Sequence, residues 1–112
     1  MGDIYIRNIR TFKTDSSVIS VRVDRMSVLG NPFYMNAESD WDLVCDKYTE
    51  YFYKKVTEKT DIAFMKELYR LKLLSLHNDI FLICWCSPMR CHAETIQKYL
   101  LQCGINDLDE FA

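Results

Sequence analysis

Three cysteines and a histidine lie close together near the C-terminus, where an apolar segment gives way to a predicted helix. Residues 80–85 are almost continuously apolar, and the four side chains are Cys84, Cys86, Cys91 and His92. Thiols and imidazoles can act as nucleophiles, proton carriers or metal ligands. A strand-to-helix turn places such groups beside the unpaired amides at the start of a helix. The spacing therefore predicts a binding or catalytic site at this turn.

Zinc is one candidate for this turn, because four thiolate or imidazole ligands can close a tetrahedron. Alternation along the strand puts Cys84 and Cys86 on the same side. However, Cys91 and His92 would have to reach one ion from consecutive positions at the helix start, and the spacing differs from that of the usual zinc knuckles. The sequence therefore favours no resident cofactor, with zinc held by these four side chains as the alternative.

The same turn could also act without a metal. The first turn of a helix stabilises an anion or a thiolate, and Arg90 adds positive charge. In this interpretation Cys86 or Cys91 is the nucleophile, and His92 or Glu94 carries the proton. The structural alternative is that these side chains only fill the core or bond the backbone.

Residues 29–33, with the sequence Leu-Gly-Asn-Pro-Phe, form a second candidate. Proline lacks a backbone donor and restricts Asn31 before it, so we expect a fixed loop. Asn31 can both donate and accept hydrogen bonds, and Phe33 could stack on a planar ring such as a base. A structural turn with an anchoring phenylalanine explains the pattern equally well.

Composition limits the classes of protein to which the chain can belong. Its 112 residues suit one domain, residues 1–112, with one hydrophobic core. The 14 basic and 16 acidic residues are mixed along the chain, which disfavours nonspecific nucleic-acid binding. Five cysteines make an odd count that suits reduced thiols, and no signal peptide or membrane span is recognisable, so we expect a cytoplasmic protein. The glycine spacing of phosphate-binding loops does not occur.

Hydrophobic periodicity predicts an α/β domain. The predicted strands span residues 4–9, 18–23 and 80–85. The predicted helices span about residues 39–57, 61–75 and 92–102. Ser39 should cap the first helix and Thr60 or Asp61 the second, while the polar residues 13–17 suit a hairpin connection or a looser loop. This order predicts a small single-domain sheet layered with helices, Rossmann-like, whose last strand is covered on both faces. The acidic tail should fray.

Several motifs together resemble the small uncharacterised family DUF4326. They are Arg25 and residues 29–33, 47–52 and 82–92, and the resemblance covers about residues 18–102. It implies a compact α/β domain of bacteria and their phages, with no assigned activity. This chain has Asp24 and Ala93 where that family often carries glycine. A similar arrangement of strand, cysteine, proline, Cys-His pair and helix occurs in another uncharacterised family, DUF488.

These observations predict that the protein binds a small anionic, nucleotide-like ligand between the Asn31 loop and the turn at residues 86–92. Contact with the ring is expected from Phe33 or Trp85. The anion would be held by the helix start and its neighbours, which are Arg25, Arg90, Cys91 and His92. A phage-encoded chain of this kind could act on a host nucleotide signal.

Two other functions are compatible with the sequence. One is a hydrolase or transferase acting on a nucleoside or nucleotide, with Cys86, Cys91 and His92 as its catalytic residues. The other is a zinc-stabilised interaction module. Aromatic side chains expected on the surface also allow a homodimer; they are Tyr51, Tyr53 and Phe111.

Overall fold

The computed structural model describes residues 2–13, 17–35, 37–85 and 90–112. The strands are β1 (Ile4–Asn8), β2 (Ile19–Arg22) and β3 (Ile80–Cys84). The helices are α1 (Trp41–Glu58), α2 (Ile62–Ser75) and α3 (Ala93–Gln102), with 3-10 turns η1 (Glu38–Asp40) and η2 (Ile105–Phe111). Helices and a parallel sheet confirm the predicted α/β class, and the arrangement is compatible with a Rossmann-like fold.

The described strands form a parallel sheet in the order β1-β3-β2. Both outer strands pair with the middle one, so that Ile4 and Ile19 flank Ile80 from opposite sides. Of the two connections that residues 13–17 allowed, a hairpin is therefore wrong, because β1 and β2 do not pair with each other. The polar turn residues suited either connection, but only the continuously apolar β3 can occupy the centre of the sheet, between the two less apolar strands.

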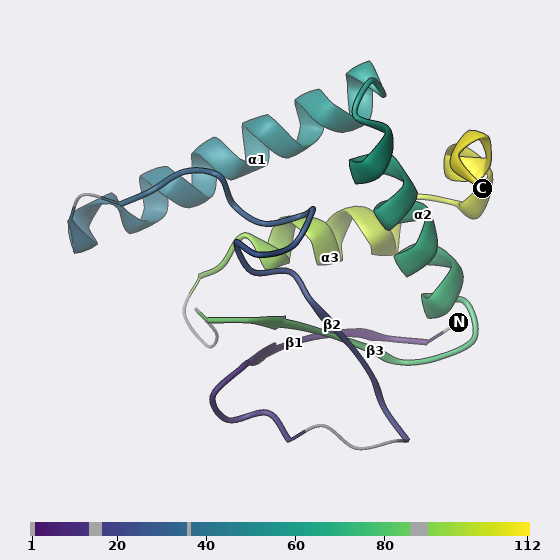
Figure 1. Cartoon of the computed structure of the whole chain (residues 1–112), viewed down its shortest axis with the longest axis horizontal. Helices are drawn as coiled ribbons and strands as arrows, with labels where there is room; N and C mark the ends of the chain where they lie inside the picture. Colours follow the sequence, from purple (N-terminus) through teal and green to yellow (C-terminus); the bar gives the residue numbers. More distant parts are fainter. Residues whose placement is uncertain (1, 14–16, 36, 86–89) are drawn as a thin grey trace.

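The two faces of the sheet are covered differently (Figure 1). All three α-helices lie on one face, where the buried side chains of the core gather; the strands contribute Ile4, Val21, Ile80, Leu82 and Cys84. On the other face Tyr5 stacks on Phe81 at 5.0 Å, and Phe12 from the β1–β2 connection lies 5.2 Å from the same ring. The last strand is thus covered on both faces, as predicted.

Helix ends follow local chemistry only in part. Asp61 caps α2, because its carboxylate accepts the Phe64 backbone N–H at 3.2 Å, as expected. Ser39 does not cap α1. It lies inside η1, and the N-cap residue is Asp40, whose side chain makes no capping bond. The extra 3-10 turn moves the start of the helix beyond the residue with the best capping chemistry.

The C-terminal tail packs against α2 instead of fraying. Its 3-10 turn η2 buries Leu108 and Phe111, and Lys59 pairs with Glu110 at 2.8 Å. Apolar side chains outweigh the acidic composition that suggested a frayed end. Phe111 is therefore not an exposed aromatic and gives no support to a dimer. None of the described helices is long and apolar enough to cross a membrane.

Candidate functional site

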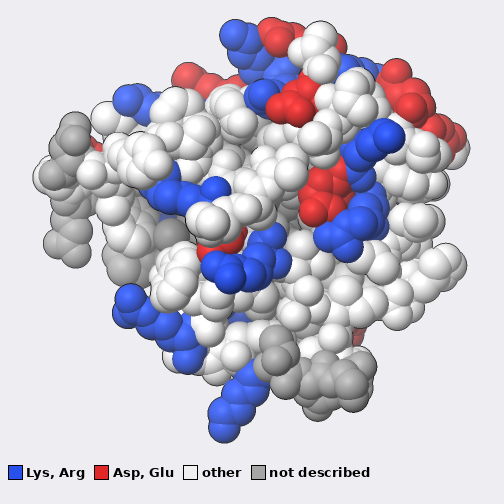
Figure 2. Space-filling view, viewed as in Figure 1, with Lys and Arg blue, Asp and Glu red and all other residues white. Residues whose placement is uncertain are grey.

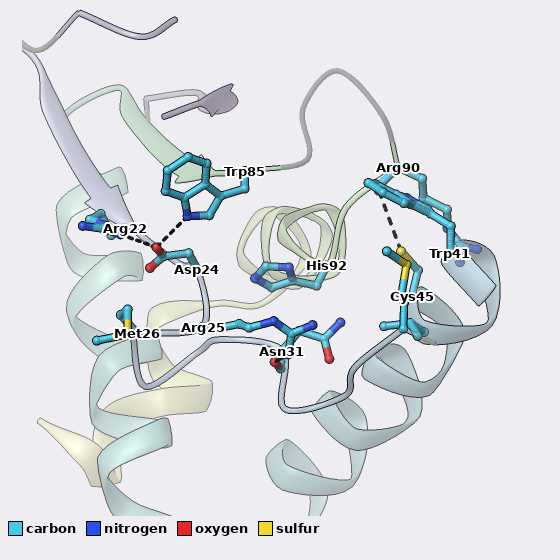
Figure 3. A pocket seen from close by; sticks show the side chains of 12 residues that line it. Arg22, Asp24, Arg25, Met26, Asn31, Trp41, Cys45, Trp85, Arg90 and His92 are labelled. Carbon is cyan, nitrogen blue, oxygen red and sulfur yellow. Dashed lines mark hydrogen bonds and ion pairs between the residues drawn. The ribbon is translucent and has the colours of Figure 1, made fainter. Parts of the chain in front are cut away.

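A pocket of about 420 Å³ opens at the carboxyl ends of β2 and β3. In open parallel sheets this end is where ligands bind, because strand ends and the following loops leave a crevice there. The volume lies within the range typical of ligand pockets, about 300–1,000 Å³. The pocket is lined by Arg22, Asp24, Arg25, Met26, Asn31, Met35, Trp41, Val44, Cys45, Trp85, Arg90 and His92. Figure 3 shows His92 at the middle of this ring of side chains.

Asp24 follows β2 and fixes the side chains on one side of the pocket (Figure 3). Its Oδ2 accepts hydrogen bonds from the Arg22 guanidinium and, at 3.1 Å, from Trp85 Nε1. Burial acts to raise the pKa of Asp24, but the bonds from Arg22 and Trp85, the charge of Arg22 and the Met26 backbone amide outweigh it and lower that pKa. The carboxylate therefore stays ionised at neutral pH and holds the Trp85 indole by its edge.

Arg25 ties the loop of residues 29–33 to the end of β2. Its guanidinium donates to the Asn31 carbonyl at 2.6 Å and to the Phe33 carbonyl at 2.5 Å, and it lies 4.2 Å from the Tyr34 ring centroid. The Asn31 side chain accepts the Phe33 backbone N–H at 2.9 Å, which confirms that this segment is a fixed loop. The Arg25 partners are neutral, so its positive charge is not balanced by a carboxylate within the described residues.

Arg90 closes the opposite side of the pocket against the start of α1. Its guanidinium pairs with Asp42 at 3.0 Å and Asp46 at 2.6 Å, and these bonds raise its pKa. Its carbonyl accepts from Trp41 Nε1 at 2.6 Å and from the Cys45 thiol at 3.8 Å. An anion would therefore have to compete with two carboxylates for the Arg90 charge.

The His92 ring is buried and has a defined tautomer. Nε2 lies against the Val23 carbonyl, which can only accept, so Nε2 carries the proton. Burial lowers the pKa of His92, so the ring is neutral and its Nδ1 is an acceptor at neutral pH. The Cys91 Sγ lies 3.5 Å from that Nδ1, so the thiol can donate its proton to the ring.

Two of the amides at the start of α3 already have acceptors in the chain. The Cys91 N–H donates to Glu94 Oε2 at 2.7 Å, and the Ala93 N–H points to Cys91 Sγ at 3.4 Å. The Glu94 carboxylate thus takes the position that an anion would have at a helix N-terminus. An incoming anion would have to displace it.

A family model described as a domain of unknown function, DUF4326, matches residues 7–102. This chain belongs to the DUF4326 family. No curated protein and no solved structure matches it. The match begins before the resemblance predicted from residue 18, and it thereby includes the last two residues of β1, Arg7 and Asn8.

The structure of this DUF4326 domain brings most of the predicted ligand-binding residues to one pocket. Those lining it are Arg25, Asn31, Trp85, Arg90 and His92. Phe33 does not line it, because its ring packs against Tyr51 at 5.8 Å. Cys91 lines a neighbouring pocket of about 320 Å³, together with Cys45, Thr49, Tyr53, Arg90, Glu94, Thr95 and Lys98.

The predicted zinc ligands do not gather in the part of the DUF4326 domain that the structure describes. Cys84 is buried in the core, and Cys91 and His92 lie at the start of α3. No group of three or more metal-ligating side chains occurs among the described residues. Cys86, predicted both as a nucleophile and as a zinc ligand, lies outside them.

The sequence did not identify several residues that shape the pocket. Asp24 is the most important of them. The sequence did contain an indication of it, because an acidic residue directly after a parallel strand lies at the end of the sheet where ligands bind. Trp41 and Cys45 recur at the helical spacing that is typical of a core face, yet both line the pocket. Met26 and Met35 have no recognisable pattern, because they sit in irregular segments on either side of the fixed loop.

Proposed function

We propose that this protein binds a small anionic, nucleotide-like ligand in the pocket at the ends of β2 and β3. The supporting observation is the Trp85 indole, which is half exposed on the pocket wall and held at its edge by Asp24. A fixed flat aromatic surface favours stacking of a planar base. The methionines Met26 and Met35 provide adaptable apolar walls for such a ring.

Arg25 is the side chain best suited to attract the anionic part. Three arginines lie on the pocket wall. Arg22 is paired with Asp24 and Arg90 with two carboxylates, whereas the hydrogen bonds of Arg25 within the described residues go to carbonyl oxygens. On the side of the molecule seen in Figure 2, basic side chains lie beside acidic ones in several small groups, with neutral surface between the groups. A single positive charge such as that of Arg25 suits a small anion better than a nucleic acid, whose many phosphates are bound by several basic side chains.

Removal of the indole tests the proposal. We expect the wild type to bind ribonucleoside 5′-monophosphates and Trp85→Ala to bind them about 10–100-fold more weakly, because base stacking contributes about 1–3 kcal/mol. Isothermal titration calorimetry with AMP, GMP, CMP and UMP measures both. Leu101→Ala removes an exposed apolar side chain from α3 outside the lining of the pocket and is the matched control. Absence of binding by the wild type, or equal binding by Trp85→Ala, would refute the proposal.

A second candidate function is hydrolysis or group transfer at a nucleoside or nucleotide. The observation that favours it is the 3.5 Å approach of Cys91 Sγ to the unprotonated Nδ1 of His92. In this reaction the thiol gives its proton to Nδ1 while Sγ attacks the glycosidic carbon. The bond to the base breaks, and the base leaves with the proton from His92; water then releases the sugar from sulfur.

Cys91→Ser separates the two functions. If the protein is an enzyme, we expect this variant to bind nucleosides as the wild type does but to release base at least about 100-fold more slowly, because a hydroxyl is a far weaker nucleophile than a thiolate at neutral pH. Chromatographic detection of free base measures the rate. Cys103→Ser alters a half-buried thiol outside the lining of both pockets and is the control. No turnover by the wild type would reject the enzyme function and leave binding intact.

A further inference from the structure

We infer that Asp24 determines which ligands the pocket accepts, because its Oδ1 receives a hydrogen bond from an N–H or O–H group on the uncharged part of the ligand. This inference rests on the proposed nucleotide-like ligand and adds the chemistry by which it is selected. The ligand class is a nucleotide with a donor beside its stacked ring. The donor is the amino group of the base or a hydroxyl of the ribose.

The two oxygens of Asp24 have very different surroundings. The residue is only 4% exposed, and Oδ2 bonds both Arg22 and Trp85. Oδ1 is buried and makes no hydrogen bond of normal geometry among the described residues, although the Met26 backbone amide helps to lower the pKa of the carboxyl group. A buried carboxylate oxygen without a donor is costly, since it has lost water without replacing it. A ligand that displaces the atoms covering Oδ1 and offers it a donor would remove that cost upon binding.

The negative charge on Asp24 favours ligand groups that donate a hydrogen bond and disfavours groups that accept one. The ion pair with Arg22 and the bond from Trp85 keep the carboxylate ionised, and an ionised carboxylate can only accept hydrogen bonds. A carbonyl or unprotonated ring nitrogen at the same position would be repelled. Discrimination of this kind is strong, because the wrong ligand leaves a buried polar group unpaired.

Trp85 brings a stacked base close to this oxygen. Its indole edge is bonded to Asp24, and the Arg10 guanidinium lies 5.3 Å from the ring centroid. Arg10 does not line the pocket, so a ligand ring stacks on the part of the indole that faces the cavity. The edge of that ring then lies beside the Asp24 carboxylate, which favours the amino group of the base over the ribose as the donor.

Pairs of nucleotides that differ in one amino group test the inference on the wild-type chain. The pairs are AMP with purine riboside 5′-monophosphate, CMP with pyrimidin-2-one riboside 5′-monophosphate, and GMP with IMP. We expect the amino-bearing member of at least one pair to bind about 10–100-fold more tightly, as for a hydrogen bond to a charged group. The 2′-deoxy form of the tightest ligand tests the ribose as donor. A difference of that size in either comparison supports the inference and names the source.

Asp24→Asn assigns the effect to this residue. The amide oxygen can keep the bonds from Arg22 and Trp85, while the amide nitrogen places a donor where Oδ1 was. We expect the preference for the amino-bearing or hydroxyl-bearing ligand to disappear in this variant and to persist in Asp109→Asn, an exposed control in η2.

The outcomes separate this inference from the proposed function. If no nucleotide binds the wild type, both fail. If nucleotides bind but neither the amino group nor the 2′-hydroxyl matters, or if Asp24→Asn keeps the wild-type preference, only the role of Asp24 is overturned. The comparison of nucleotide pairs uses the wild-type protein alone. It can therefore overturn the inference even if Asp24→Asn does not fold.

Discussion

Gly30→Ala is expected to destabilise the protein by about 1–3 kcal/mol and to abolish or strongly weaken ligand binding. A Cβ atom at position 30 would lie 2.3 Å from the Asp24 carbonyl oxygen and 2.7 Å from the Arg25 Cα. Both are backbone atoms, which cannot rotate away as a side chain could. The substitution must therefore push apart the fixed loop and the segment that carries Asp24 and Arg25, two sides of the pocket.

Gly104→Ala is a matched control for this prediction. A Cβ there would meet only Asp107 Oδ2, at 3.6 Å, which is an ordinary contact. Urea unfolding followed by tryptophan fluorescence compares the two variants, and titration with the nucleotide that binds the wild type most tightly measures the pocket. If Gly30→Ala unfolds at the same urea concentration as Gly104→Ala and keeps wild-type affinity, the close approach of the two segments does not shape the pocket.

The periodic parts of this fold could be predicted from the sequence because their signal is local. The apolar stripe of α1, including Tyr48 and Phe52, recurs at helical spacing, and β3 is short and almost wholly apolar. Strand order is not a local property. The polar residues after β1 suit a tight turn, and nothing within them indicates that the chain crosses to the far edge of the sheet.

Most of the predicted site residues lie around one pocket, and the exceptions have a physical cause. Asn31 and Trp85 are in the pocket because a fixed loop and a strand end hold them there. Phe33 was assigned to the same site by adjacency, but neighbouring side chains in a loop point in different directions, and its ring packs on Tyr51. Asp24 directly follows a predicted strand, but this position alone did not reveal its partners, Arg22 and Trp85, of which one is distant in sequence.

The Cys91–His92 pair shows why side-chain chemistry alone did not identify a reaction. The sequence placed the two side chains at a helix start, and the structure adds the Val23 carbonyl that fixes the histidine tautomer. It also places Cys91 on the wall of the second pocket, while His92 lines the first. The pair therefore lies between two cavities.

Tyr48→Phe is expected to lower the free energy of unfolding by about 1–3 kcal/mol, because it leaves a buried carbonyl without its donor. The Tyr48 hydroxyl donates to the Leu29 carbonyl at 2.7 Å, and the side chain is fully buried. Burial raises the pKa of Tyr48 well above its ordinary value. The hydroxyl therefore keeps its proton at neutral pH and remains a hydrogen-bond donor. This bond joins α1 to the first residue of the fixed loop.

The same variant should weaken nucleotide binding, because a loop released at Leu29 no longer holds Asn31 in place. The contact between the Tyr48 and His92 rings, at 5.0 Å, does not need the hydroxyl, so the environment of His92 should change little. Tyr69→Phe is the control, since the half-buried Tyr69 hydroxyl has no hydrogen-bond partner within the described ranges. Urea unfolding and calorimetric titration of both variants measure the two effects. A loss of stability with unchanged affinity would show that the loop of residues 29–33 keeps its position without this bond. The shape of the pocket beside this loop would then depend on Arg25 and Gly30.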